Sequence, residues 1–179
     1  MTVELDEYRE ELIEAAPELA DTLDGLFHES ARLMSPAGLK DYLDGARAMI
    51  SLGKGPALLV SYLDEMPQVV KECGEDIIRD VAGATLKLAS MVSGEILTLM
   101  ISTLPGAARR FGDPDLLLGY LQLLHRLAAR APRGLRPMFG VLEDLLSKLT
   151  LSGLRRWVDF GAEAYRRDLP KQADYFGLV

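Results

Sequence analysis

The 179-residue chain contains few of the residues on which most protein chemistry depends: one cysteine, two histidines and one tryptophan. The single cysteine, Cys73, excludes an internal disulfide and favours a reducing compartment. The histidines, His28 and His125, are 97 positions apart, and neither has a second histidine or cysteine three or four residues away, as zinc sites do. The sequence therefore predicts neither a disulfide scaffold nor a metal site, and we expect no cofactor.

Long hydrophobic runs are also missing. The most apolar stretch, residues 96–108, spans 13 residues and contains Pro105, whereas a transmembrane helix needs about 20 apolar residues. The first residues, MTVELDEYREEL, are acidic and resemble neither a secretory signal nor a transit peptide. We therefore expect a soluble, cytoplasmic protein that does not enter a membrane.

Leucine and alanine dominate the apolar residues, which make up 49% of the chain, and this balance favours helices over strands. Ser35-Pro36 and Asp113-Pro114 are each typical of an N-cap followed by proline at the first helical position, and Gly55-Pro56 opens another helix. Pro17 and Pro67 are expected to kink or split two helical stretches. Apolar spacing of three and four residues predicts helices near 3–15, 17–33, 36–51, 56–73, 75–92, 94–111, 114–131, 133–148 and 152–168.

The predicted helices repeat along the chain. Apolar residues near the start of alternate helices recur at steps of 38, 39 and 38 positions: Leu39, Ile77, Leu116 and Leu154. Met66-Pro67 and Leu104-Pro105, in the helices between, are again 38 positions apart. Two helices per repeat of this length are typical of a HEAT-like α-solenoid of stacked antiparallel helix pairs. We predict an all-α chain of this kind, with acidic capping helices at 1–34 and repeats at 35–179; a coincidental helical bundle is the alternative.

An aromatic residue near the aligned position and a glycine about one turn later recur along the repeats, although not every repeat has both. The aromatic residues are Tyr42, Tyr120 and Trp157, and the glycines are Gly45, Gly83 and Gly161. Core packing explains both, because glycine lets a neighbouring helix approach closely. We expect Trp157 and Tyr165 to point into the stack and Tyr175 and Phe176 to cover its open end.

Charge is unevenly distributed. Residues 1–30 hold ten acids and one base, whereas residues 105–179 hold twelve bases and eight acids. The repeat alignment puts the helices at 75–92, 114–131 and 152–168 in equivalent places, so that their polar residues share one surface. Its arginines are Arg79, Arg126, Arg130, Arg155, Arg156, Arg166 and Arg167. We predict that this surface binds an acidic protein surface, for which the chain's own residues 1–30 are one candidate, while ordinary solvated helix faces are the alternative. Aromatic residues are not interleaved with the arginines, so we do not expect nucleic acid.

The segment GLRRWVDFGAEAYRRDLPKQADYF, residues 153–176, resembles a G-L-x-x-W…G element that is followed about twenty residues later by Tyr-Phe. This element occurs in the helical region of von Willebrand factor A-domain proteins that work with MoxR-type AAA+ ATPases, of the nitric oxide reductase activation protein D and rubisco activase adaptor type. The matching residues here are Gly153, Leu154, Trp157, Gly161, Tyr175 and Phe176. Residues 102–121 resemble the preceding repeat of that family.

The resemblance implies a non-enzymatic adaptor that helps a MoxR-type ATPase to engage and remodel a target enzyme. The family's A domain, with its D-x-S-x-S metal site, does not occur in these 179 residues, so the resemblance brings no metal ligand to this chain. Two alternatives stay open: an unrelated stand-alone protein-binding α-solenoid, and a small helical enzyme that uses His125 or Glu143.

Overall fold

The computed structural model describes residues 2–130 and 132–166, and within them every regular element is a helix, as predicted. The α-helices are α1 (Thr2–Ala15), α2 (Ala20–Leu33), α3 (Pro36–Ser51), α4 (Pro56–Cys73), α5 (Ile77–Ala89), α6 (Gly94–Phe111), α7 (Pro114–Arg130), α8 (Leu135–Lys148) and α9 (Leu151–Arg166). Short 3₁₀ helices at Pro17–Leu19 and Pro132–Gly134 precede α2 and α8. None of these helices combines the length and the apolar character that crossing a lipid bilayer requires.

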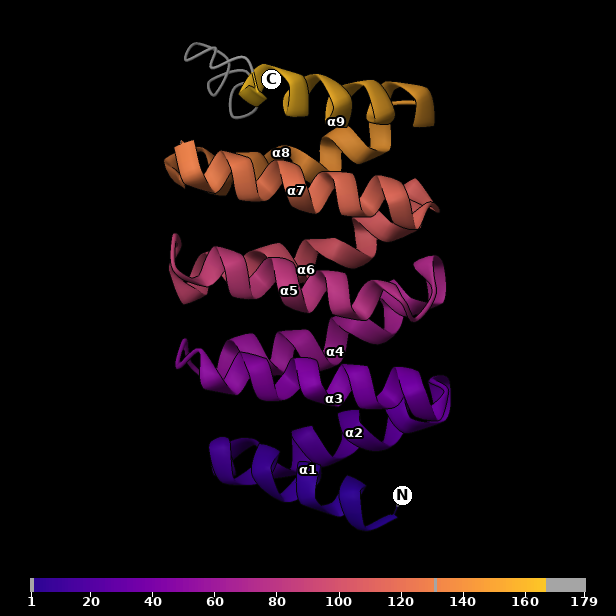
Figure 1. Cartoon of the computed structure of the whole chain (residues 1–179), viewed down its shortest axis with the longest axis vertical. Coiled ribbons are helices and arrows are strands. Elements are labelled where there is room, and N and C mark those ends of the chain that lie inside the picture. The colour runs from indigo at the N-terminus through magenta and orange to yellow at the C-terminus, as the bar shows by residue number, and fades with distance from the viewer. Residues whose placement is uncertain (1, 131, 167–179) are drawn as a thin grey trace.

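The helices stack in chain order, with the two ends of the described chain at opposite ends of the stack (Figure 1). Each helix packs against the helix two positions further along: α3 on α5, α5 on α7 and α7 on α9 in one layer, and α4 on α6 and α6 on α8 in the other. The acidic helices α1 and α2 continue the two layers by packing on α3 and α4.

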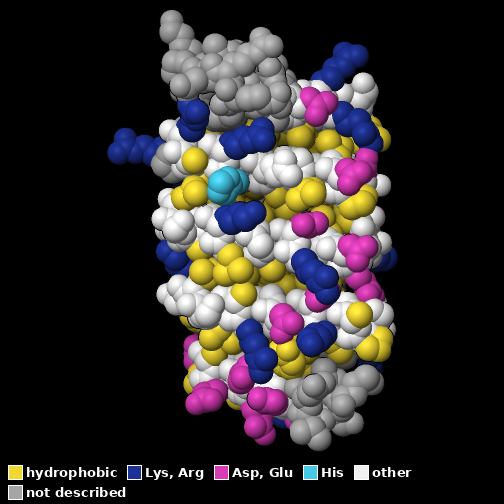
Figure 2. All heavy atoms as spheres, in the orientation of Figure 1, with side chains coloured by type: hydrophobic (Ala, Val, Ile, Leu, Met, Phe, Trp, Pro, Cys, Tyr) yellow, Lys and Arg dark blue, Asp and Glu magenta, His cyan; other side chains and the backbone are white. Residues whose placement is uncertain are grey.

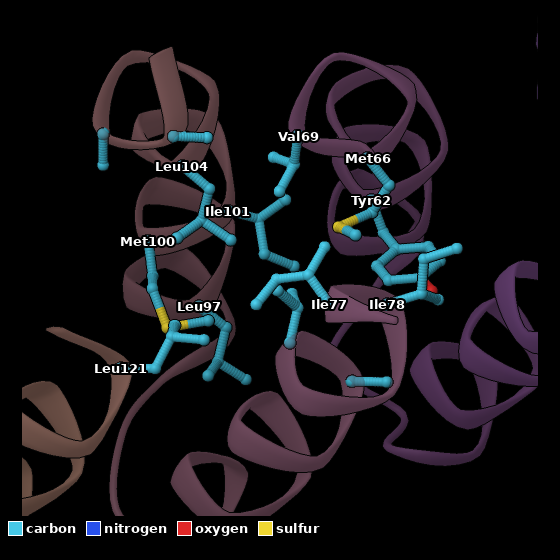
Figure 3. Packing of buried hydrophobic residues seen from close by; sticks show 14 of the residues in the cluster. Tyr62, Met66, Val69, Ile77, Ile78, Leu97, Met100, Ile101, Leu104 and Leu121 are labelled. Carbon is cyan, nitrogen blue, oxygen red and sulfur yellow. The ribbon is translucent and has the colours of Figure 1, made fainter. Parts of the chain in front are cut away.

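One continuous apolar core lies between the layers and extends from Leu12 in α1 to Val158 in α9. The four aligned residues identified in the sequence, Leu39, Ile77, Leu116 and Leu154, are all buried in it. Figure 3 shows how side chains from α4, α5, α6 and α7 meet in the middle of this core. Each fully buried side chain of this size contributes about 1.5–3 kcal/mol relative to leaving it exposed.

The helix boundaries follow the capping residues that the sequence predicted. Ser35 Oγ accepts a hydrogen bond from the Gly38 backbone N–H at 3.1 Å. Asp113 Oδ1 accepts a hydrogen bond from the Asp115 N–H at 3.0 Å, and so satisfies one of the unpaired donors of α7. Gly55 precedes α4 with φ of +97°, a conformation that other residues rarely adopt.

The two prolines that were expected to interrupt helices behave differently. Pro17 lies in the 3₁₀ turn that separates α1 from α2, as predicted. Pro67 does not split α4, which continues from Pro56 to Cys73. Proline cannot donate to the carbonyl four residues earlier, that of Leu63. The Tyr42 hydroxyl of α3 donates to this carbonyl at 2.6 Å instead, so the Leu63 carbonyl has a hydrogen-bond donor despite Pro67.

Polar contacts between one pair of helices and the next connect residues 36 to 42 positions apart. Arginine–carboxylate pairs of this kind are Arg47–Glu11, Arg79–Asp41, Arg109–Glu72, Arg136–Glu95 and Arg155–Asp113. The Glu75 carboxylate also accepts hydrogen bonds from the backbone N–H and hydroxyl of Ser35, at the start of α3. Each exposed ion pair contributes at most about 1 kcal/mol, but together they fix the register between neighbouring helices.

Candidate protein-docking groove

A groove of about 850 Å³ runs between α5 and α7. Its lining residues are Arg79, Asp80, Gly83, Ala84 and Lys87 from α5, and Leu118, Leu121, Gln122, His125 and Arg126 from α7. Figure 2 shows basic, acidic and apolar side chains interspersed across this layer, with further acidic side chains gathered at the N-terminal end. We call this feature the basic groove.

The periodicity of α5 determines which of its residues reach the basic groove. Ile77, Ile78, Val81, Thr85 and Leu88 are buried on the inner face of the helix. Residues 79, 83 and 87 follow one another at steps of four and therefore share the outer face. Arg79 and Lys87 therefore lie along one line of the helix surface, with Gly83 between them.

The floor of the basic groove is formed by small and apolar residues. Leu121 is buried, Leu118 and Ala84 are partly exposed, and a Cβ atom built on Gly83 would meet no neighbouring atom within 4 Å. Three cationic side chains, Arg79, Lys87 and Arg126, surround this floor together with one carboxylate, Asp80. Such a combination suits a partner segment that carries both carboxylates and an apolar edge.

Arg79 is held at the edge of the basic groove by an ion pair. Its Nε atom lies 2.9 Å from Asp41 Oδ2 of α3. The hydrogen bond to this carboxylate, followed by its charge, raises the pKa of Arg79, so the guanidinium stays protonated throughout the usual pH range. Asp41 therefore offsets part of the charge that Arg79 brings to the basic groove.

The predicted arginine surface is only partly brought together in the basic groove. Arg79 and Arg126 both line it, whereas Arg155 pairs with Asp113 where α9 and α7 begin. Arg130 and Arg156 are exposed but do not belong to the lining. The side chains of Arg166 and Arg167 lie outside the described residues. Lys87 was missed in the sequence, although its position eight residues after Arg79 was a usable signal.

Residues 1–30 of the same molecule do not occupy the basic groove. They form α1 and most of α2, which pack on α3 and α4, and none of them contributes to the lining. Among the described residues, the acidic N-terminal helices therefore do not supply an occupant for the basic groove.

Two of the residues that carry the family resemblance, Leu154 and Trp157, belong to the core or pack against it. Leu154 is fully buried, and the partly buried ring of Trp157 lies 6.2 Å from the ring centre of Tyr120. This contact agrees with the expectation that Trp157 faces the stack. The structure does not describe the surroundings of Gly161, Tyr165, Tyr175 or Phe176, so their expected roles stay predictions.

The residues considered for catalysis or metal binding are dispersed. His125 lines the basic groove, and Glu143 is in α8, in the other layer, with its side chain outside the described residues. Among the described residues, no three histidine, cysteine or acidic side chains gather where they could hold a metal ion. Burial raises the pKa of the Cys73 thiol, which opposes formation of a reactive thiolate.

A second groove, of about 820 Å³, lies between α6 and α8 in the opposite layer. Its lining includes Leu99, Phe139 and Leu142, with Arg109 and Arg110 at one end. Arg110 donates from Nε to the Leu146 carbonyl at 2.6 Å and also to the Leu149 carbonyl, so its charge is committed to the C-terminal end of α8. The lining of this groove holds two charged side chains, Arg109 and Arg110, whereas the lining of the basic groove holds four.

No protein-family model, no curated protein and no solved structure matches this chain.

Proposed function

We propose that this chain is a protein-binding scaffold built as a HEAT-like α-solenoid, and that it docks an acidic segment of a partner protein in the basic groove. The observation that carries the proposal is the groove itself, in which Lys87, Arg126 and Arg79 surround a floor of small and apolar side chains. Stacked helix pairs commonly present an extended surface of this kind to their partners.

The repeat architecture has support from two independent spacings. Equivalent apolar residues recur at 38, 39 and 38 positions, and polar contacts between helix pairs span 36 to 42 positions. The packing of each helix against the helix two positions further along supports the same architecture, because stacked repeats contact only their neighbours.

The family resemblance suggests the class of partner. If the chain is the helical region of a von Willebrand factor A-domain adaptor, a MoxR-type AAA+ ATPase or its target enzyme supplies the acidic segment. This part of the proposal rests on Gly153, Leu154, Trp157 and Gly161 in the sequence, together with Tyr175 and Phe176.

The first test is binding of the purified MoxR-type ATPase from the same organism, measured by biolayer interferometry. We expect binding to weaken at least about tenfold in the variant that combines Lys87→Glu with Arg126→Glu. The matched control combines Arg32→Glu with Lys71→Glu, which changes the net charge equally at exposed positions outside the groove, and it should bind like the native chain. Equal binding by the groove variant would contradict docking in the basic groove.

A second test separates the scaffold from the adaptor assignment. The probe is a synthetic helical peptide with glutamates on one face and leucines on the other, and a peptide with lysine in place of each glutamate is its control. Binding of the acidic peptide alone, lost in the groove variant, supports an acid-binding scaffold even if the ATPase does not bind. If neither the ATPase nor the acidic peptide binds, the proposed function is wrong.

A further inference from the structure

The acidic helix α1 displays carboxylates to solvent on one side. Glu7, Glu10 and Glu14 are exposed and follow one another at steps of three and four residues, which places them on one face of the helix. Glu11, in contrast, is turned towards α3, where its Oε1 atom accepts a hydrogen bond from Arg47 Nη2 at 2.8 Å. We call the three exposed residues the acidic ridge.

The acidic ridge and the basic groove belong to different parts of one molecule. α1 packs on α2 and α3, whereas the groove begins at α5, further along the stack. Figure 1 shows α3 between α1 and α5 in the same layer. The two surfaces therefore meet only when two copies of the chain approach each other.

The dimensions of the two surfaces agree. Glu7 and Glu14 are seven residues apart, which corresponds to about 10 Å along a helix. Arg79 and Lys87 are eight residues apart on α5, which corresponds to about 12 Å. A single helix laid along the basic groove can therefore place its glutamates beside both ends of the cationic row.

We infer that the basic groove of one copy receives the acidic ridge of a second copy. The inference rests on the proposed function, because it requires the basic groove to be a docking site. When each copy supplies both surfaces, reciprocal docking closes the contact into a two-fold dimer. An acidic partner protein then competes with the second copy for the same groove, and self-association lowers the apparent affinity for that partner.

Sedimentation velocity of the full chain over a range of concentrations and salt tests this inference. The ridge variant combines Glu7→Lys, Glu10→Lys and Glu14→Lys, and the groove variant combines Lys87→Glu and Arg126→Glu. We expect the native chain to dimerise at low salt and its association constant to fall about tenfold or more by 0.5 M NaCl. Each variant alone should be monomeric, with helix content and melting temperature close to native.

A mixture of the ridge variant and the groove variant gives the most direct test of the contact. The ridge variant keeps an intact groove and the groove variant keeps an intact ridge, so an equimolar mixture should form a heterodimer. A chain that carries both sets of reversals should dimerise again, because the charges are complementary once more. A native chain that stays monomeric at low salt, a salt-independent dimer or a mixture without a heterodimer would each overturn the inference.

The same variants distinguish this inference from the proposed function. The ridge variant should bind the acidic peptide at least as tightly as the native chain, because its groove is intact. If the ridge variant binds the peptide but the native chain shows no self-association, only the inference fails. If the groove variant also binds the peptide as tightly as the native chain does, the proposed docking site fails as well.

Discussion

The helix pairs α3–α4 and α5–α6 differ in what surrounds two glycines, Gly45 of α3 and Gly83 of α5, which are 38 positions apart. A Cβ atom at Gly45 would lie 2.0 Å from the Tyr62 hydroxyl oxygen and 2.7 Å from Cζ of the same ring. At Gly83 it would meet nothing within 4 Å. The residue 38 positions after Tyr62 is Met100, which is buried but carries no ring. The Tyr62 ring therefore fills the space beside Gly45, whereas Gly83 borders the basic groove.

A second difference lies one turn earlier on the same helices. Tyr42 of α3 is fully buried and stacks on Tyr62, with ring centres 5.6 Å apart. The buried residues of α3 recur on α5 after 39 positions, and the residue 39 positions after Tyr42 is Val81, which is buried but carries no ring. Two stacked tyrosines thus fill the contact inside the first pair, whereas Val81 and Met100 fill the corresponding positions of the second pair without a ring. Single side chains thus decide whether the space beside a helix is filled by a ring or borders a groove.

The substitution Gly45→Ala should have the largest effect on this contrast. The new methyl group would have to displace the buried Tyr62 ring, and overpacking of this kind costs about 2–3 kcal/mol. Denaturant unfolding monitored by circular dichroism measures the loss. Removing the hydroxyl in the background Gly45→Ala with Tyr62→Phe relieves the shortest contact and should restore part of the stability. If Gly45→Ala alone leaves stability unchanged, the packing of Tyr62 against this helix is wrong.

Tyr42→Phe should have the next largest effect, a loss of about 1–2 kcal/mol. The variant leaves the Leu63 carbonyl, four residues before Pro67, without its donor. It also removes one of the two acceptors of the Ser30 hydroxyl, at 3.0 Å, and leaves the Leu26 carbonyl at 2.8 Å as the other. Tyr62→Phe is the control, because the Tyr62 hydroxyl is buried without a hydrogen-bond partner among the described residues. Its removal should be neutral or stabilising, and equal losses in both variants would refute the role given to Tyr42.

Glu75→Gln should cost about 1 kcal/mol at neutral pH, the size of a helix-capping contribution. Hydrogen bonds from the Ser35 hydroxyl and then from its backbone N–H lower the pKa of the Glu75 carboxyl. A lowered pKa in the folded state stabilises the protein above the unfolded value of about 4.3. This stability disappears as the pH falls through the folded pKa. Thermal melts should show the difference between native and variant chains at pH 7 and its loss in acid; a pH-independent difference would exclude the charge as its cause.

Gly83→Ala should have the smallest effect on stability, with the opposite sign. The site has room for a methyl group within a helix, where alanine is favoured over glycine by up to about 1 kcal/mol. The melting temperature should therefore rise slightly, while the methyl group narrows the basic groove and weakens binding of the acidic peptide. A rise in stability with unchanged peptide binding would place the partner outside this part of the groove.

Features that depend on residues close together in the sequence could be predicted. The helices and their caps at Ser35 and Asp113 are of this kind, and they are confirmed. A helix near 56–73 was predicted and α4 has these bounds, but the hydrogen bond from the Tyr42 hydroxyl, 25 positions before Pro67, to the Leu63 carbonyl could not be predicted from the sequence. The shared location of Arg79 and Arg126 was predicted from the repeat. The basic groove as a space was not, because its existence depends on which side chains fill the positions between helices. The ion pair of Arg155 with Asp113 likewise required the spatial arrangement of α7 and α9.

The polar contacts between residues 36 to 42 positions apart also have a consequence for folding during synthesis. A contact of this length closes as soon as the next two helices have left the ribosome, without waiting for the end of the chain. Short closures lose little entropy and are associated with rapid folding. Each new helix pair can therefore dock on a pair that is already folded, and the acidic end, which is synthesised first, is the surface on which the rest of the stack grows.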